Sequence, residues 1–170
     1  MLRADGNLPY FFFGTLMDPD VLTVVLDRPA ETVQRTAARL ERFRRARVRG
    51  ESYPVLEPSE DGIVHGLLVL RLTELETRRI AYYEGDEYRL VRLDVICGEG
   101  VQSALAFAEA TSLATDGEWD FTRWQREEKQ ALLEAARDFM ARFGDAHDPE
   151  TADARWLEAK QQAMVRTRSR

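Results

Sequence analysis

Two short stretches of the chain carry residue types that could do chemistry. The first is an aromatic stretch that turns toward a helix, which Asp18 can cap and Pro19 can begin. Backbone N–H groups in such a turn lie near the positive end of the helix dipole and can receive a carboxylate or a developing oxyanion. On pattern alone an ordinary strand-to-helix turn is the better interpretation. The residues of this stretch are Phe13, Gly14, Thr15, Leu16 and Met17.

The second stretch is Tyr82-Tyr83-Glu84-Gly85, at the end of an expected helix. A carboxylate at a helix C-terminus meets the negative end of the dipole, and aromatic neighbours exclude water from it. Both effects raise the pKa of Glu84 toward the range in which a general base works best. The alternative, a surface glutamate at a helix end, is about equally compatible with the spacing.

The remaining chemically interesting residues favour structural roles. His65 and His147 are the only histidines, and we expect a half-buried strand residue and a surface loop residue, respectively. Cys97 is the only cysteine, and we expect it to fill a small apolar space in a strand. No histidine or cysteine pair has metal-ligand spacing, so we expect no metal site.

Charge argues against a general nucleic-acid role. The formal net charge of the 170 residues is −6, whereas nucleic-acid binding depends on neutralising phosphates. Seven arginines between Arg35 and Arg49 are the exception. They indicate a solvated strand face more strongly than a binding site for phosphate or an acidic peptide.

The elements that must position these stretches follow from capping signals and periodicity. Helices are expected over about 19–26 and over 73–83, where Thr73 and Glu76 form a capping box and Gly85 follows the last turn. The expected strands and extended stretches cover 9–14, 33–49, 53–56, 63–72, 87–97 and 101–108, with turns at 57–62 and 98–100.

The C-terminal third is expected to be helical. Its large apolar residues recur at helical spacing with charged residues between them, and Asp148-Pro149 is expected to begin a further helix. The recurring residues are Phe121, Trp124, Leu132, Ala135, Phe139 and Phe143.

Length and composition fit one globular domain in a reducing compartment. The hydrophobic fraction is 44% and the charged fraction 32%. The N-terminal residues carry no long apolar stretch and the lone cysteine allows no intrachain disulfide, so we expect a cytoplasmic protein without a membrane segment.

Four motifs in a fixed order resemble the γ-glutamyl cyclotransferase superfamily, in particular its avirulence-induced-gene-like branch. Residues 9–110 carry the resemblance, and the helix from Trp119 onward is similar to the C-terminal extension of plant members. The motifs are Phe12-Phe13-Gly14-Thr15-Leu16-Met17, Tyr53-Pro54-Val55-Leu56, Val64-His65-Gly66 and Tyr83-Glu84-Gly85-Asp86-Glu87-Tyr88-Arg89.

The resemblance implies an α+β fold, a small mixed and mostly antiparallel β-barrel flanked by helices. We expect the barrel domain over 1–113 and a helical extension packed on it over 114–170. It also implies a cofactor-free reaction, in which the α-amino group of a γ-glutamyl unit attacks its own γ-carbonyl and releases 5-oxoproline and an amine. By this resemblance Glu84 is the acid/base, residues 13–17 hold the glutamyl group, and Tyr53 and Tyr88 complete the substrate site.

One departure concerns the substrate rather than the reaction class. The family motif begins with Tyr where this chain has Phe13, so a substrate hydrogen bond is missing. Two alternatives to an enzyme stay open: a catalytically silent module that binds a small carboxylate, and a protein-interaction role, with Phe121, Trp124 and Phe139 packing within the chain or forming a homo-oligomer.

Overall fold

Six strands form one sheet in the part of the chain that the structure describes. The computed structural model describes residues 8–85, 88–109 and 113–144. The strands are β1 (Tyr10–Phe12), β2 (Arg35–Val48), β3 (Pro54–Val69), β4 (Tyr88–Cys97), β5 (Gly100–Glu109) and β6 (Thr115–Glu118). Their order is β3-β1-β5-β4-β2-β6, and β3 also pairs with β2, so five strands close into a barrel and β6 lies beside β2. The β1–β5 pair is parallel and the others are antiparallel, which is the mixed α+β barrel that the sequence predicts.

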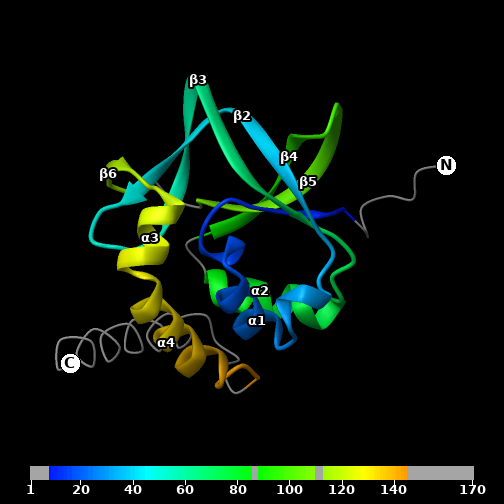
Figure 1. The fold of residues 1–170 in the computed structure, drawn as a ribbon, viewed down its shortest axis with the longest axis vertical. Coiled ribbons are helices and arrows are strands. Elements are labelled where there is room, and N and C mark those ends of the chain that lie inside the picture. Colours follow the sequence, from blue (N-terminus) through cyan, green and yellow to red (C-terminus); the bar gives the residue numbers. More distant parts are fainter. Residues whose placement is uncertain (1–7, 86–87, 110–112, 145–170) are drawn as a thin grey trace.

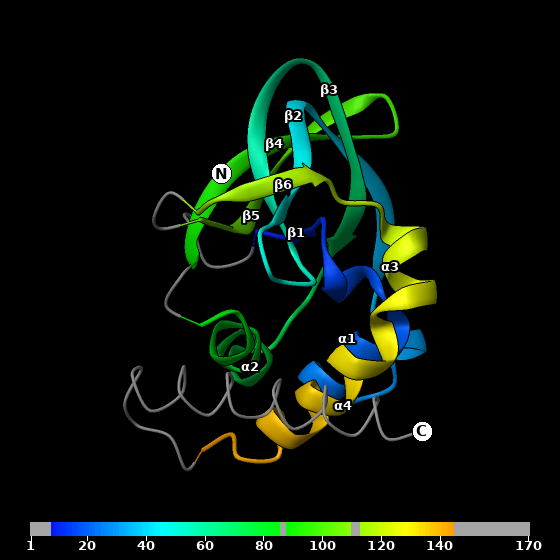
Figure 2. The ribbon, with the colours of Figure 1, turned by 90° about the vertical axis from the view of Figure 1, so that its left-hand side faces the viewer.

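Helices cover one end of this barrel. They are α1 (Pro19–Leu26), α2 (Glu74–Glu84), α3 (Phe121–Glu127) and α4 (Lys129–Met140), with 3-10 turns η1 (Thr15–Met17) and η2 (Ala30–Thr32). In Figure 1, α1, α2 and α4 lie below the barrel, and α3 descends from the barrel to α4. The turned view in Figure 2 keeps α1 beside α4, with which it is in contact, and places α2 to one side.

Alternation along β1 divides the apolar core into two clusters. Phe11 and Phe13 face the inside of the barrel, whereas Phe12 faces the helices. The barrel cluster contains Phe11, Phe13, Ala38, Leu40, Val64, Leu68, Val95, Ala104 and Ala106. The helix-side cluster includes Phe12, the buried residues of α1 and α4, Trp119 and Trp124. Trp124 and Phe139 therefore pack within this chain.

The close approach of β3 to β1 explains why the Val64-His65-Gly66 motif ends in glycine. A Cβ built on Gly66 would lie 2.4 Å from the carbonyl oxygen of Phe12 and 2.5 Å from the ring of Phe11. These distances are shorter than any van der Waals contact, so only glycine lets β3 approach β1 here.

The capping signals place both predicted helices correctly. Asp18 caps α1 with its side chain, and Pro19 is the first helical residue. Thr73 and Glu76 form the predicted capping box, and Gly85 follows α2 with φ 74°. These signals are local, so the surrounding fold did not need to be known.

Several predictions about the elements are wrong. Residues 57–62 do not separate two segments, because β3 continues through them and absorbs the extra residues in an irregularity opposite Arg42, whose φ is 66°. The short strand β6 was not predicted. The expected helix after Trp119 is two helices, α3 and α4, divided at Glu128, where φ is −126°. His65 is exposed rather than half-buried.

Of the remaining sequence predictions, the structure tests the one for Cys97 and leaves the others open. Cys97 is partly buried and packs against the barrel cluster, as expected. His147 and the helix expected from Asp148-Pro149 lie outside the described residues. The division of the chain at residue 113 stays a prediction.

Candidate active site

Residues 13–17, the first of the two stretches that could do chemistry, form a tight turn between β1 and α1. The N–H of Met17 donates to the carbonyl of Gly14 and that of Asp18 to the carbonyl of Thr15, each at 3.1 Å. The N–H groups of Thr15 and Leu16 precede these bonds and have no acceptor within the turn. They are the main-chain donors available to a carboxylate or an oxyanion.

Pro54 closes one side of this turn. A Cβ built on Gly14 would lie 3.2 Å from two ring carbons of Pro54, a tight contact. The turn therefore lies against the start of β3, where the Tyr53-Pro54 motif is found. Two motifs that are about forty residues apart in this sequence therefore meet in space.

Asp18, at the end of the turn, is buried and has four hydrogen-bonding partners. Its Oδ1 accepts from the N–H of Asp20 at 3.0 Å and of Val21 at 3.2 Å. Its Oδ2 accepts from Gln125 at 2.8 Å and pairs with the Lys129 ammonium at 3.0 Å. Burial opposes ionisation of Asp18, but the donors outweigh it and hold its pKa below the usual range.

A hydrogen bond joins the turn to the end of α2. The hydroxyls of Thr15 and Tyr83 lie 2.8 Å apart, and both side chains are buried. Burial raises the pKa of Tyr83 above its ordinary value, so this hydroxyl stays protonated. Because Tyr83 immediately precedes Glu84, the two chemical stretches of the sequence come together in the fold.

Glu84 is the last residue of α2 and is partly buried. Burial raises the pKa of Glu84 from 4.5 to about 8. No hydrogen bond or ion pair to this carboxylate is found within residues 8–85, 88–109 and 113–144, so nothing there offsets the loss of water. The carboxyl group can thus take up and release a proton near neutral pH.

The two tyrosines of the predicted site lie together. The rings of Tyr53 and Tyr88 are 6.1 Å apart in an edge-on arrangement, and both pack against a small cluster formed by Ala46, Val48 and Val55. Phe13 differs from them, because its side chain points into the barrel cluster and is 7% exposed. The backbone of Phe13 thus leads into the turn, whereas its ring is part of the barrel core and does not line the predicted site.

Arg45 is a residue near the site that the sequence did not single out. Its Nη1 lies 3.3 Å from the carbonyl oxygen of Phe13 and 3.4 Å from that of His65. The guanidinium also lies over the ring of Trp119, at 5.4 Å. Burial lowers the pKa of Arg45, although Asp120 and Glu118 oppose this shift. Spacing among seven neighbouring arginines carries no signal that would have distinguished it.

Other arginines of this stretch are tied to acidic residues. Arg44 pairs with Glu57 at 2.7 Å, and Arg47 pairs with Glu128 at 2.6 Å. Arg39 is 3.4 Å from Glu41. These pairs favour a structural strand face over a site for phosphate.

The described residues offer no obvious place for a metal ion. No group of three or more histidine, cysteine, aspartate or glutamate side chains that could hold one occurs among them. Within the same ranges, no helix is both long and apolar enough to cross a membrane.

The fold is a small mixed barrel. The turn after β1 is hydrogen-bonded to the end of α2, where Glu84 has a raised pKa. The model of a family described as "Gamma-glutamyl cyclotransferase, AIG2-like" matches residues 10–121. This match spans more than half of the chain, which therefore belongs to that family.

Known relatives agree with this assignment. "AIG2-like protein B" of Arabidopsis thaliana is 32% identical over 136 residues, covering 78% of this chain and 77% of the relative. "AIG2-like protein A" of the same plant is 33% identical over 134 residues, covering 76% and 79%.

Solved structures agree on the fold. The solution structure of an Arabidopsis thaliana protein has a TM-score of 0.57 at 29% identity and covers 82% of this chain and 94% of its own. The crystal structure of an uncharacterized Homo sapiens protein has a TM-score of 0.55 at 13% identity, covering 89% and 87%.

Proposed function

We propose that this protein is a γ-glutamyl cyclotransferase in which Glu84 is the general acid and base. The observation that carries the proposal is the 2.8 Å bond between the Thr15 and Tyr83 hydroxyls. It joins a turn with available main-chain donors to the helix end that carries Glu84. Family membership supports a cyclotransferase-like activity, and the identity of the acid/base rests on this geometry.

The proposed reaction needs one proton carrier and good positioning. Ionised Glu84 takes a proton from the α-ammonium of the substrate, and the freed amine attacks the γ-carbonyl carbon. A ring C–N bond forms, and the N–H groups of Thr15 and Leu16 stabilise the oxyanion. The intermediate then collapses as the bond to the leaving nitrogen breaks and Glu84 gives its proton to that nitrogen. The ring nitrogen still holds one surplus proton, which ionised Glu84 takes and passes to the departing amine, so the amine leaves as an ammonium ion. The products are 5-oxoproline and a free amine.

The pKa of Glu84 suits this double role. At about 8, it leaves a useful fraction of carboxylate at neutral pH while making the carboxylic acid a competent donor. An ordinary glutamate, with a pKa near 4.3, would be a poorer base for an ammonium group. Because the attack is intramolecular, holding the substrate in a reactive conformation supplies much of the rate.

We propose a γ-glutamyl amine or γ-glutamyl amino acid as substrate. The paired rings of Tyr53 and Tyr88 offer an apolar wall to the substrate, and the main-chain donors of the turn suit the carboxylate or carbonyl of the glutamyl part. Phe13 supplies no hydroxyl, so recognition at that position depends on the backbone.

The test is release of 5-oxoproline from a panel of γ-glutamyl amines and γ-glutamyl amino acids. We expect at least one compound to react and Glu84→Gln to lower kcat by roughly 10²–10⁴-fold. Glu74→Gln is the matched control, because Glu74 lies on the same helix and its side chain is 82% exposed. Equal release by the wild type and Glu84→Gln would exclude Glu84 as the acid/base.

A catalytically silent module that binds a small carboxylate is the second candidate, and the hydroxyl missing at Phe13 favours it. Thermal-shift measurements with the same panel separate the two. A compound that raises Tm and is recovered unchanged supports binding without turnover.

A further inference from the structure

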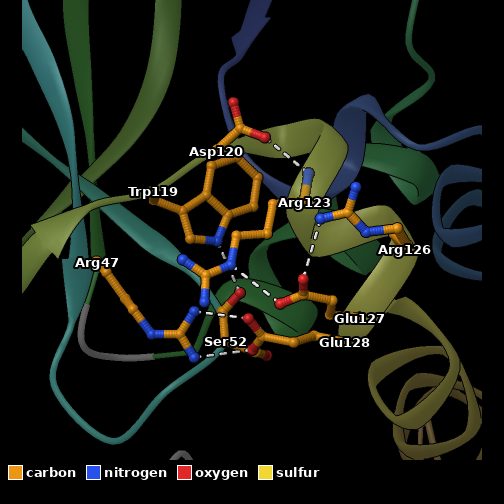
Figure 3. A network of polar contacts seen from close by, with 8 residues as sticks. All are labelled: Arg47, Ser52, Trp119, Asp120, Arg123, Arg126, Glu127 and Glu128. Carbon is orange, nitrogen blue, oxygen red and sulfur yellow. Dashed lines mark hydrogen bonds and ion pairs between the residues drawn. The ribbon is translucent and has the colours of Figure 1, made fainter.

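The segment 119–129 contacts the site from two directions. On one side, the indole Nε1 of Trp119 donates to the carbonyl of Ser52 at 2.9 Å, directly before the Tyr53-Pro54 motif. Glu128 accepts two bonds from Arg47, at 2.6 and 2.9 Å. Figure 3 shows both contacts together, with the segment lying across the hairpin that joins β2 to β3. This side holds the strand that packs against Gly14.

On the other side, the same segment reaches the end of the turn. Gln125 Nε2 donates to Asp18 Oδ2 at 2.8 Å, and Lys129 Nζ lies 3.0 Å from that oxygen. The second carboxylate oxygen of Asp18 caps α1. The orientation of one buried carboxylate therefore links the C-terminal helices to the first turn of α1 and to residues 15–17 before it.

We infer that Gln125 and Lys129 are positioning residues, which hold the main-chain donors of the Thr15–Met17 turn in their binding geometry through Asp18. This inference rests on the proposed function for its substrate, but the contacts are independent of it. The proposed reaction gives neither residue a contact with the substrate, so their effect on the turn passes through Asp18.

Burial is what makes the carboxylate sensitive to these two donors. Asp18 is fully buried, so no solvent lies beside it and a lost partner can be replaced only if the surrounding structure rearranges. Without the Lys129 ammonium or the Gln125 amide, Oδ2 of Asp18 has one hydrogen-bond donor fewer. The side chain must then rotate or admit a water molecule. Either response disturbs the cap of α1 and the turn that ends at Met17.

The first experiment compares Lys129→Met with Asp20→Asn. Lys129 also pairs with the exposed side chain of Asp20, at 2.6 Å, so Asp20→Asn removes an ion pair of the same lysine while the main-chain N–H of residue 20 still donates to Asp18. We expect Lys129→Met to lower kcat/KM about tenfold, because the donors of the turn hold both the substrate and the oxyanion, while the pH profile of kcat/KM keeps its wild-type shape. Asp20→Asn should leave kcat and KM unchanged. Equal effects of the two variants, or an unchanged kcat/KM in Lys129→Met, overturn the inference.

The second variant, Gln125→Glu, is nearly the same shape but can ionise. Within the described residues, the charged group in contact with Asp18 is Lys129 on α4, which also pairs with Asp20 on α1, and the buried Tyr83 hydroxyl on α2 feels the charge of Asp18. At low pH the introduced carboxyl keeps its proton and donates to Asp18 as the amide did. As it ionises, two carboxylates repel each other. We expect kcat/KM of this variant, divided by that of the wild type, to fall as pH rises and the introduced carboxyl ionises beside Asp18. A ratio that does not change with pH contradicts the inference.

Hydrogen–deuterium exchange gives a readout that needs no substrate. In Lys129→Met we expect the hydrogen-bonded amides of residues 17, 18 and 20–22 to exchange at least about tenfold faster, with the β4–β5 hairpin unchanged. Unchanged exchange at these amides overturns the inference even if the enzyme is active. Faster exchange there with no turnover of any γ-glutamyl compound supports the inference and counts against the proposed function instead.

Discussion

Two carboxylates near the turn, those of Asp18 and Glu84, differ in helix position, in hydrogen-bonding partners and in the direction of their pKa shift. Asp18 stands at a helix N-terminus with four donors, and its pKa is lowered although it is buried. Glu84 stands at a helix C-terminus without such donors in the described ranges, and its pKa is raised to about 8. Burial acts in the same direction on both. The number of partners therefore decides which acid stays charged and supports the fold, and which can exchange a proton.

The largest effect should follow from removing the carboxylate of Asp18. Asp18→Ala deletes the cap of α1 and leaves Lys129 and Gln125 without this acceptor. We expect the free energy of unfolding to fall by about 3 kcal/mol, measured by denaturant unfolding. Asp120→Ala is the control, because Asp120 caps α3 but is exposed, and should cost about 1 kcal/mol. Equal costs would mean that the buried network adds nothing to the cap.

Glu84 should behave in the opposite way, since its burial is a cost once the group is charged. The folded-state pKa of about 8 exceeds the unfolded value of 4.5, so the folded state binds more protons between these values. Stability from this group is therefore complete below about pH 4.5 and is lost as pH rises through 8. At about 1.4 kcal/mol per pKa unit, and allowing for partial exposure, Glu84→Gln should stabilise the protein by roughly 3 kcal/mol at pH 9.

Unfolding curves at low and high pH test this difference. At about pH 4 the variant and the wild type should have similar stabilities, because the wild-type carboxyl is neutral in the fold. A destabilised Glu84→Gln at high pH would show that the charged carboxylate has a favourable partner, and the contrast with Asp18 would fail.

An NMR titration measures the pKa of the Glu84 carboxyl group directly. In protein labelled with ¹³C at the glutamate carboxyl carbon, one signal should titrate near pH 8, and it should be absent from Glu84→Gln. With an active substrate, kcat/KM should rise about tenfold per pH unit below that value and then level off. A Glu84 signal that titrates near its ordinary pKa would remove the difference between the two carboxylates.

Local sequence signals predicted the helix ends that carry Asp18 and Glu84, but they did not predict the partners of Asp18. Asp18-Pro19 and the Thr73/Glu76 box are complete within four residues, so both helices and the placement of Glu84 at a helix end could be predicted from the sequence. Gln125 meets Asp18 across 107 residues, a contact without any local trace.

The barrel shows the same limit. Turn-forming residues at 57–62 correctly marked an irregular backbone, but pairing with β2 carries the strand through them, which only the partner strand decides. The inward direction of Phe13 also depends on the barrel closing around β1. The family resemblance, and not spacing, led us to expect Glu84 and the turn at one substrate site, and the bond between Thr15 and Tyr83 was not predicted.

The smallest effect should come from the bond that joins the two regions. Tyr83→Phe removes one hydroxyl and leaves that of Thr15 buried without this partner, which should cost about 1–2 kcal/mol in the free energy of unfolding. Thr15→Val should cost a similar amount. In the double variant neither orphaned hydroxyl remains, so its cost should fall below the sum of the single costs by about 1 kcal/mol. Strict additivity would mean that the bond does not couple the turn to the helix end, and Asp18 and Glu84 would then be neighbours in the fold without being parts of one site.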